Sequence, residues 1–279
     1  MAKKEIIKKG NTAVSTDVIE LEQFANEGLE NVTARDVKLP IIKVLTSNSP
    51  ALNESDAKYN ADARPGDIFN EVSNTVYKGK EGMLVVPCLY VNTFNEWADR
   101  GDSAGRPVAI HGDPSVMKTT QRADDGRDRT ESGTYIEDTG NHFVFILDED
   151  YNPVESALIT MKSTQKKKSR LWNSMMMSRR MKGSSGRLFT PPSWASVYRL
   201  TTVQESNSKG TWYGWATAFD RFLDQNTEAN LLQITKGFSE NAKKLDMVSG
   251  VDFNDEKATP SAKVVSEVLE GESKSDVPF

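Results

Sequence analysis

Alternating and continuous runs of hydrophobic residues predict several strands in the middle of the chain. The strongest signal is the apolar run Met83 to Val91, which continues through Phe94 to Trp97, and Pro87 inside it predicts an edge strand or a bulge. His142 to Leu147 and Glu155 to Met161 flank a short stretch rich in Asp, Asn and Pro, which is the pattern of a β-hairpin. The sequence therefore predicts a fold whose centre is built from strands.

Three further patterns extend this picture. Trp194 to Val203 and Thr211 to Phe219 flank the polar turn Asn207 to Gly210 and predict a second hairpin. Leu39 to Leu45 is a compact apolar run that we expect to dock on the core. Gly101 to Asn141 is dominated by Gly, Asp, Arg, Thr and Ser, so we expect a long loop there.

Two helices are predicted from apolar positions that recur every three or four residues. One begins at Ser163 or Thr164, either of which can cap it, and runs to about Lys182, where Gly183 to Gly186 ends the pattern. The other spans roughly Thr227 to Leu245. The order of elements indicates a mainly β fold with helices (α+β). We expect an OB-fold-like five-stranded barrel with an inserted helix and a C-terminal helix, an architecture that binds oligonucleotides.

Changes in polarity divide the chain into three parts. Residues 1–35 are polar and mixed in charge, and we expect a flexible N-terminal arm with a short helix at Thr16 to Glu27. Residues 36–248 hold the apolar runs and form the predicted OB-like nucleic-acid-binding domain. Residues 249–279 are acidic and rich in polar residues, and such a segment cannot bury enough apolar surface to stay folded. A disordered acidic C-terminal tail is therefore expected.

Composition excludes several classes of protein. No apolar run approaches the roughly 20 residues that are needed to span a bilayer, so no membrane partner is expected. The single cysteine, Cys88, rules out an intramolecular disulfide and a cysteine metal cluster. Because Cys88 lies in an apolar strand, it is predicted to be an inert core thiol. These features are typical of a protein of a reducing cytoplasm.

Charge is segregated along the chain in a way that the net charge conceals. The formal net charge is −5, yet Ser156 to Gln204 holds ten basic residues and no acidic one, which leaves −15 for the rest of the chain. Such segregation indicates two surfaces with different partners. The same region is rich in aromatic residues, since four of the five tryptophans lie between Trp172 and Trp215.

The basic block with its interleaved aromatic residues predicts a groove for single-stranded nucleic acid. Cations hold the phosphates and flat side chains stack on unpaired bases, each stack contributing ~1–3 kcal/mol. In Trp212-Tyr213-Gly214-Trp215, Trp212 faces opposite to Tyr213 and Trp215, so one of these two groups is expected to serve the core. The predicted DNA contacts are Lys162, Lys166, Lys167, Lys168, Arg170, Trp172, Arg179, Arg180, Lys182, Arg187, Trp194, Tyr198, Arg199, Trp212, Tyr213 and Trp215.

Known catalytic signatures are absent from the sequence, so neither an enzymatic activity nor a metal or cofactor is expected. His111 and His142 lack the HExxH spacing or any other ligand spacing, and we expect each at a loop or at the start of a strand. There is no P-loop, GxGxxG or GxSxG motif. Asp124, Asp125 and Asp128 leave open a magnesium-dependent nuclease, although acids on a Gly-rich loop favour plain solvation.

The chain ends in Asp276-Val277-Pro278-Phe279, and these four residues resemble the acidic C-terminal tip of bacterial single-stranded DNA-binding proteins. Bacteriophage single-stranded DNA-binding proteins look similar in layout, with an OB core and an acidic tail that ends in an aromatic residue. Leu39 to Lys43 and Gly82 to Pro87 also look like segments of phage early proteins. The resemblance implies a non-catalytic phage protein of DNA replication, recombination and repair in the host cytoplasm. Its tip would recruit polymerase, helicase or nuclease partners.

Binding of a single strand has a simple physical mechanism in this chain. Counterion release and stacking would hold the strand, and the acidic tail would compete for the same cations until DNA displaces it. Three alternatives stay open: a strand-annealing recombinase, the magnesium-dependent nuclease, and a virion or scaffold protein whose basic helix contacts packaged DNA. Assembly into a homo-oligomer is also an open expectation.

Overall fold

The computed structural model divides the chain into two compact units, Met1–Val32 and Thr33–Phe279. In the first unit the described residues form turns closed by hydrogen bonds from Glu27 N to Phe24 O and from Val32 N to Leu29 O. Most of the predicted N-terminal arm with its short helix, and the whole predicted acidic tail, lie outside the described residues. The structure describes residues 24, 27–32, 39–99, 106–208 and 210–244.

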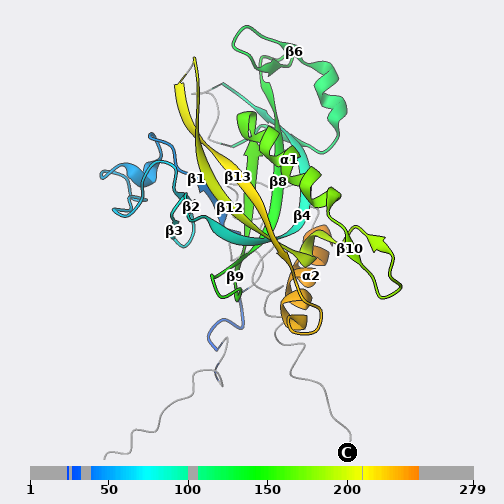
Figure 1. Cartoon of the computed structure of the whole chain (residues 1–279). Coiled ribbons are helices and arrows are strands. Elements are labelled where there is room, and N and C mark those ends of the chain that lie inside the picture. Colours follow the sequence, from blue (N-terminus) through cyan, green and yellow to red (C-terminus); the bar gives the residue numbers. More distant parts are fainter. Residues whose placement is uncertain (1–23, 25–26, 33–38, 100–105, 209, 245–279) are drawn as a thin grey trace, which may run out of the picture. The chain divides into compact units, whose positions relative to one another are not determined.

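The second unit is mainly β, with two α-helices and several 3₁₀ helices (Figure 1). Its strands are β1 (Ile41–Val44), β2 (Ile68–Asn70), β3 (Val76–Tyr77), β4 (Met83–Trp97), β5 (Ala109–His111), β6 (Gln121–Arg122), β7 (Asp128–Arg129), β8 (Tyr135–Leu147), β9 (Pro153–Lys162), β10 (Met181–Lys182), β11 (Leu188–Phe189), β12 (Ser196–Asn207) and β13 (Gly210–Phe222). Its helices are η2 (Pro50–Leu52), η3 (Pro114–Thr119), η4 (Ser163–Gln165), α1 (Lys166–Ser178), η5 (Ser193–Ala195) and α2 (Ala229–Lys244).

Within the described residues, eleven strands form one sheet that curls into a half-barrel (Figure 1). Its path runs β13-β12-β4-β8-β9-β1-β2-β3, with β5 beside β4 and the β6–β7 ribbon beside β8. The β1–β9 pair is parallel, whereas the other pairs of this path are antiparallel. The expectation of a mainly β fold with helices is confirmed. The five-stranded OB barrel is not, because the sheet has many more strands.

The long strands β4 and β8 carry the centre of the sheet. They pair from Leu84 opposite Leu147 to Trp97 opposite Tyr135, with a bulge between Pro87 and Leu89. Proline has no N–H to donate to a ladder, so the bulge is where a central strand tolerates it. The predicted strand and its bulge are confirmed. Both predicted hairpins are also confirmed, as β8–β9 and β12–β13.

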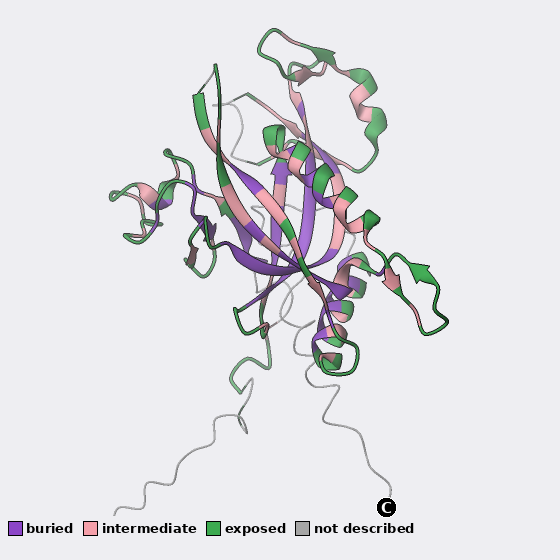
Figure 2. Ribbon diagram, in the orientation of Figure 1, coloured by how far each residue is buried: buried purple, intermediate pink, exposed green. Residues whose placement is uncertain are grey.

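Two hydrophobic cores cover the two faces of this sheet. Because successive side chains of a strand point to opposite faces, Phe143 and Phe145 pack with Phe238 of α2, while Val144 packs on the other face with Trp172 of α1. The strands are purple in Figure 2 where they pass between the helices, which marks them as buried. The apolar run that contains Ile42 docks on the core as predicted, as strand β1.

Two predictions about the middle of the chain are wrong in part. The helix expected to reach Lys182 ends at Ser178, and neither Ser163 nor Thr164 caps it with a side-chain hydrogen bond. The long loop expected at Gly101 to Asn141 contains short strands and ends in the first half of β8. The last predicted helix is confirmed as α2, and no described helix is long and apolar enough to cross a membrane.

Candidate nucleic-acid interface

A short β-hairpin follows α1 and extends away from the sheet (Figure 1). We call residues 179–190 the basic hairpin. Its two strands pair Met181 with Phe189 and Lys182 with Leu188. The turn is closed by a bond from Gly183 N to Arg187 O, and Gly186 adopts a φ of 78°, which glycine accepts without strain. A β-hairpin therefore follows α1 at residues 179–190, where the sequence predicted only the end of the helix.

Five of the ten predicted cations are engaged by carboxylates. Their partners lie on β8, β12 or the β8–β9 turn, and the ammonium or guanidinium groups approach them within 2.5 to 3.4 Å. A side chain held in this way stabilises the surface locally and has less charge to offer a phosphate. The pairs are Lys162–Glu137, Lys166–Asp138, Lys168–Glu205, Arg170–Asp138 and Arg199–Glu149.

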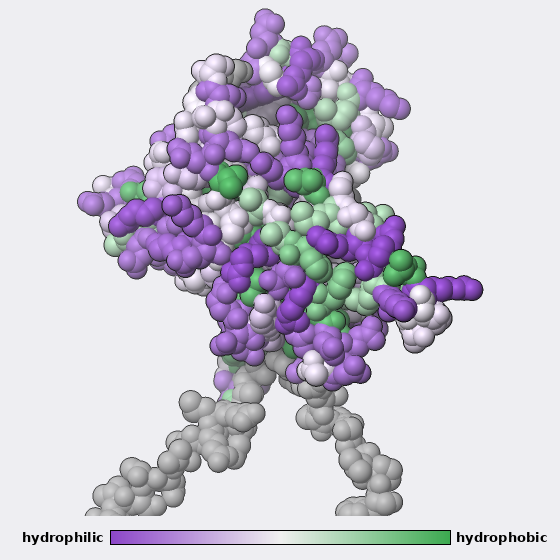
Figure 3. All heavy atoms as spheres, viewed as in Figure 1, coloured by the Kyte–Doolittle hydropathy of each residue, from purple (hydrophilic) through white to green (hydrophobic). Residues whose placement is uncertain are grey.

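The other five predicted cations make no ion pair with a described carboxylate, and four of them belong to the basic hairpin. Lys167, Lys182 and Arg187 are exposed. Arg180 donates to the carbonyl oxygens of Met177 and Arg179, while the Arg179 guanidinium lies 4.1 Å from the Phe219 ring centroid. Figure 3 shows purple, hydrophilic atoms beside green, hydrophobic ones on this hairpin. Among the predicted contacts, the cations without a carboxylate partner are thus concentrated on one ribbon.

Three of the predicted stacking residues are core residues. Trp172, Tyr198 and Trp215 have exposed fractions of 0%, 0% and 2%. Trp172 lies against His142 and Tyr198, with ring centroids 4.4 and 5.9 Å apart. A ring enclosed in this way has no face available for a base, so the prediction that these three contact DNA is corrected.

The other three predicted rings are half-buried. Trp212 donates its Nε1–H to Glu205, and Tyr213 packs on Gly66, where an added Cβ would lie 2.6 Å from the Tyr213 ring. Alternation along β13 predicted that either Trp212 or the pair of Tyr213 and Trp215 would serve the core. Trp215, from the second face, is the ring that is buried there. Trp194 differs from these rings because it lines a pocket beside the basic hairpin.

The DNA contacts predicted from the sequence do not include the apolar residues of the basic hairpin. Leu188 is 69% exposed and Phe189 is 40% exposed, and Met177 at the end of α1 is 68% exposed. Exposed apolar side chains among unpaired cations indicate a binding surface more than a solvated face. The available signal was the pair of short basic and apolar runs on either side of Gly183 to Gly186, a hairpin pattern that resembles a helix end.

An apolar pocket lies at the foot of the basic hairpin. Its volume is about 270 Å³, and its walls come from the hairpin, from η5 and from α2. Met181 and Phe189 form one wall, and Trp194 and Leu232 belong to others. Lys236 of α2 also lines the pocket and is exposed, so a cation accompanies the apolar walls.

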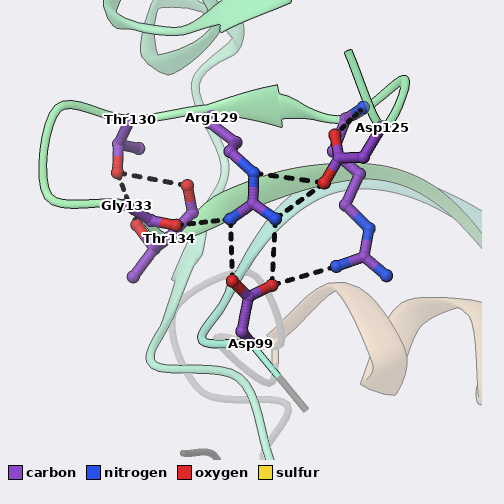
Figure 4. A network of polar contacts seen from close by, with 7 residues as sticks. Asp99, Asp125, Arg129, Thr130, Gly133 and Thr134 are labelled. Atoms are coloured by element: carbon purple, nitrogen blue, oxygen red, sulfur yellow. Dashed lines mark hydrogen bonds and ion pairs between the residues drawn. The ribbon is translucent and has the colours of Figure 1, made fainter. Parts of the chain in front are cut away.

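Two of the three acids that suggested a magnesium site, Asp125 and Asp128, are held by arginines, and Figure 4 shows the contacts of Asp125. Arg129 donates to both oxygens of Asp99, at 3.0 and 3.1 Å, and to Asp125 at 2.7 Å. These bonds lower the pKa of both carboxyl groups. For Asp125, the hydrogen bond that Arg127 N donates to it makes the larger contribution. Asp128 pairs with Arg122. Among the described residues no group of three or more His, Cys, Asp or Glu could hold a metal ion.

The two histidines and the cysteine have structural surroundings. His142 lies within β8, not at its start, and its Nε2 is 2.8 Å from Ser169 Oγ. Burial lowers its pKa to about 3, and Lys166 adds repulsion. His111 lies in β5, with Nε2 3.0 Å from Glu96. Cys88 is buried, and burial raises the pKa of its thiol, as expected for an inert core residue.

The sequence was also compared with known proteins. The model of a family described as the Pam3 phage gp34-like protein matches residues 8–247. No curated protein and no solved structure matches the chain. The predicted partner-binding tip, Asp276 to Phe279, lies outside both the matched and the described residues.

Proposed function

The chain belongs to the Pam3 phage gp34-like family and is a phage protein, and from this premise we propose that it binds single-stranded DNA without catalysis. The observation that carries the proposal is the concentration of unpaired cations on the basic hairpin. Arg179, Arg180, Lys182 and Arg187 come from one ribbon, together with the exposed side chains of Leu188 and Phe189. We call these six residues, with Lys167 on α1, the DNA surface.

Phosphates bind to such a surface because each neutralised charge releases a condensed counterion. For single strands, the logarithm of the affinity falls with the logarithm of the salt concentration with a slope of about −0.7 per phosphate contact. The paired cations, such as Lys168 with Glu205, contribute less because binding would first have to break an existing contact. The salt dependence is therefore expected to come from the basic hairpin.

Preference for a single strand over a duplex comes from the apolar part of the same ribbon. Unpaired bases expose flat faces that stack on aromatic side chains, whereas duplex bases are already stacked and paired. Phe189 is accessible for such a contact and lies one residue away from Leu188 and two from Arg187. A ring and a cation two residues apart can contact the base and the phosphate of one nucleotide.

The C-terminal residues Asp276 to Phe279 complete the proposal. We assign them to the recruitment of replication or recombination proteins, because an acidic tip with a terminal ring suits capture by a basic, apolar groove on another protein. The nuclease alternative receives no support from the described residues, since Asp125 and Asp128 are bound to arginines. Nothing in the described residues favours the recombinase or scaffold alternatives.

Titration of a fluorescent oligo-dT and of a matching duplex across a range of salt concentrations tests this function. The protein should bind the single strand more tightly at every salt concentration. Lys182→Ala with Arg187→Ala should reduce the steepness of the salt dependence by about 1.4, from two lost contacts. Lys80→Ala with Lys118→Ala removes the same charge from exposed positions elsewhere and should leave the slope unchanged. Equal affinity for the two DNA forms would refute the proposal.

A further inference from the structure

The pocket at the foot of the basic hairpin is nearly free of polar atoms. Met181, Phe189, Pro191, Trp194 and Leu232 contribute apolar walls. Its volume, about 270 Å³, lies just below the range of roughly 300–1,000 Å³ that is usual for small-molecule pockets. It therefore suits one flat, weakly polar group better than a whole small molecule.

Both strands of the basic hairpin present one face to this pocket. Met181 is paired with Phe189, and both residues line the pocket. Arg187 is two residues before Phe189, so alternation places it on the same face of the ribbon. Its cross-strand neighbour Gly183 confirms this face, because a Cβ there would lie 3.7 Å from the Phe189 ring. Leu188 and Lys182 belong to the opposite face.

One cation lines the pocket, and a second is close in sequence to its Phe189 wall. Arg187 precedes the wall formed by Phe189, and Lys236 comes from α2. Lys236 has one described anionic neighbour, Glu240 at 3.7 Å, and both side chains are more than half exposed. Exposed pairs of this kind contribute little and are readily exchanged for another anion. The arrangement thus matches a ligand with a flat apolar part between anionic groups.

We propose that this pocket binds one unpaired nucleobase of the bound strand, with the neighbouring phosphates at Arg187 and Lys236. The inference rests on the proposed function and adds the site at which the strand is anchored. A nucleobase supplies the flat ring, and the DNA strand supplies a phosphate on each side of it. An aromatic side chain of a protein partner would supply the ring without the two flanking negative charges. A base in a duplex would have to leave its stack to enter, so the pocket also selects for single strands.

Phe189→Ala and Leu188→Ala form a matched pair for the test. The two residues are neighbours on β11, and both are exposed, but only Phe189 lines the pocket. Each variant and the wild-type protein are titrated with oligo-dT and with an oligomer of the same length whose residues are abasic. The abasic oligomer keeps the phosphates and lacks the rings.

The expected result is a loss of affinity for oligo-dT of about 5- to 150-fold in Phe189→Ala, the range for one base–aromatic stack. The same variant should bind the abasic oligomer like the wild type, and Leu188→Ala should bind both oligomers within about twofold of it. Trp194→Phe gives a second measurement, since oligo-dT should quench less tryptophan emission in this variant than in the wild type.

Three results would overturn the inference, and they differ in what else they affect. If the wild type binds oligo-dT but Phe189→Ala has no effect, the pocket does not hold a base, and the proposed function stands. If Leu188→Ala loses as much affinity as Phe189→Ala, the base contacts the outer face of the ribbon instead. If the wild type does not bind oligo-dT at all, the inference and the proposed function fail together.

Discussion

Lys166 Nζ lies 2.6 Å from Asp138 Oδ1, inside the junction between α1 and the sheet. Lys166 also donates to Asn92 and Tyr90, and its residue exposure is only 8%. The lysine that the sequence assigned to a DNA phosphate therefore fixes the first turn of the helix to strands β4 and β8. Its neighbour Lys167 is exposed, so two adjacent lysines of one basic run have different roles.

This difference predicts that only one of the two alanine substitutions destabilises the protein. Lys166→Ala leaves Asp138 and Asn92 without their buried partner and should lower the free energy of unfolding by about 2 kcal/mol. Lys167→Ala should change it by less than about 0.5 kcal/mol. Urea denaturation measures both values. Equal stability of the two variants would show that the Lys166 contacts do not hold α1.

His142 predicts a loss of stability in mildly acidic solution. Its pKa in the folded protein, about 3, is below the ordinary value of 6.5, so the unfolded chain binds a proton that the folded protein excludes. Stability should therefore be unaffected above pH 6.5 and fall by about 1.4 kcal/mol per pH unit below it. Between pH 6.5 and 5 the expected loss is about 2 kcal/mol. Most carboxyl groups titrate below this window.

Denaturation curves at several pH values measure this effect. His142→Gln should remove most of the pH dependence between 5 and 6.5, because glutamine has no proton to gain. His111→Gln is the control, since His111 is the other histidine of the chain and lies on β5 beside Glu96. A pH dependence that survives in His142→Gln would assign the effect to other groups.

The burial of Trp172 predicts that its ring supports the fold and not the binding of DNA. Trp172→Phe leaves a small cavity beside His142 and Tyr198 and should cost about 1–2 kcal/mol of unfolding free energy. The affinity for oligo-dT, measured well below the melting temperature, should stay within about twofold. Leu171→Ala, at an exposed position of the same helix, should leave both quantities unchanged. A large loss of affinity in Trp172→Phe would restore the ring to the DNA surface.

The acidic C-terminal segment is expected to compete with DNA for the basic hairpin. Deletion of residues 250–279 removes negative charge and should tighten oligo-dT binding at low salt, with the difference fading as salt screens the charges. The effect should be smaller when Lys182 and Arg187 are replaced by alanine, because these cations are the predicted targets. An unchanged low-salt affinity after deletion would contradict the competition.

The strands and the α2 helix could be predicted because their signals are local. Apolar runs such as Met83 to Val91, and turn residues such as Asn207 to Gly210, decide strand and hairpin formation within a few residues. The predicted five-stranded OB barrel was not confirmed, because the number of strands in a sheet depends on pairing between distant segments. Strand β1, for example, lies parallel to β9, more than a hundred residues away.

The candidate site likewise combines features that the sequence predicts with features that only the tertiary structure decides. The sequence by itself determined a block of basic and aromatic residues without acids, and this charge alone predicts an anionic ligand. Which cations are available was decided by tertiary contacts, since the acids Glu137, Asp138 and Glu205 come from outside the block and neutralise part of it. Register and helix packing likewise buried Trp172 and Trp215. Charge composition is a property of the chain, whereas availability of a charge or a ring depends on what the fold places beside it.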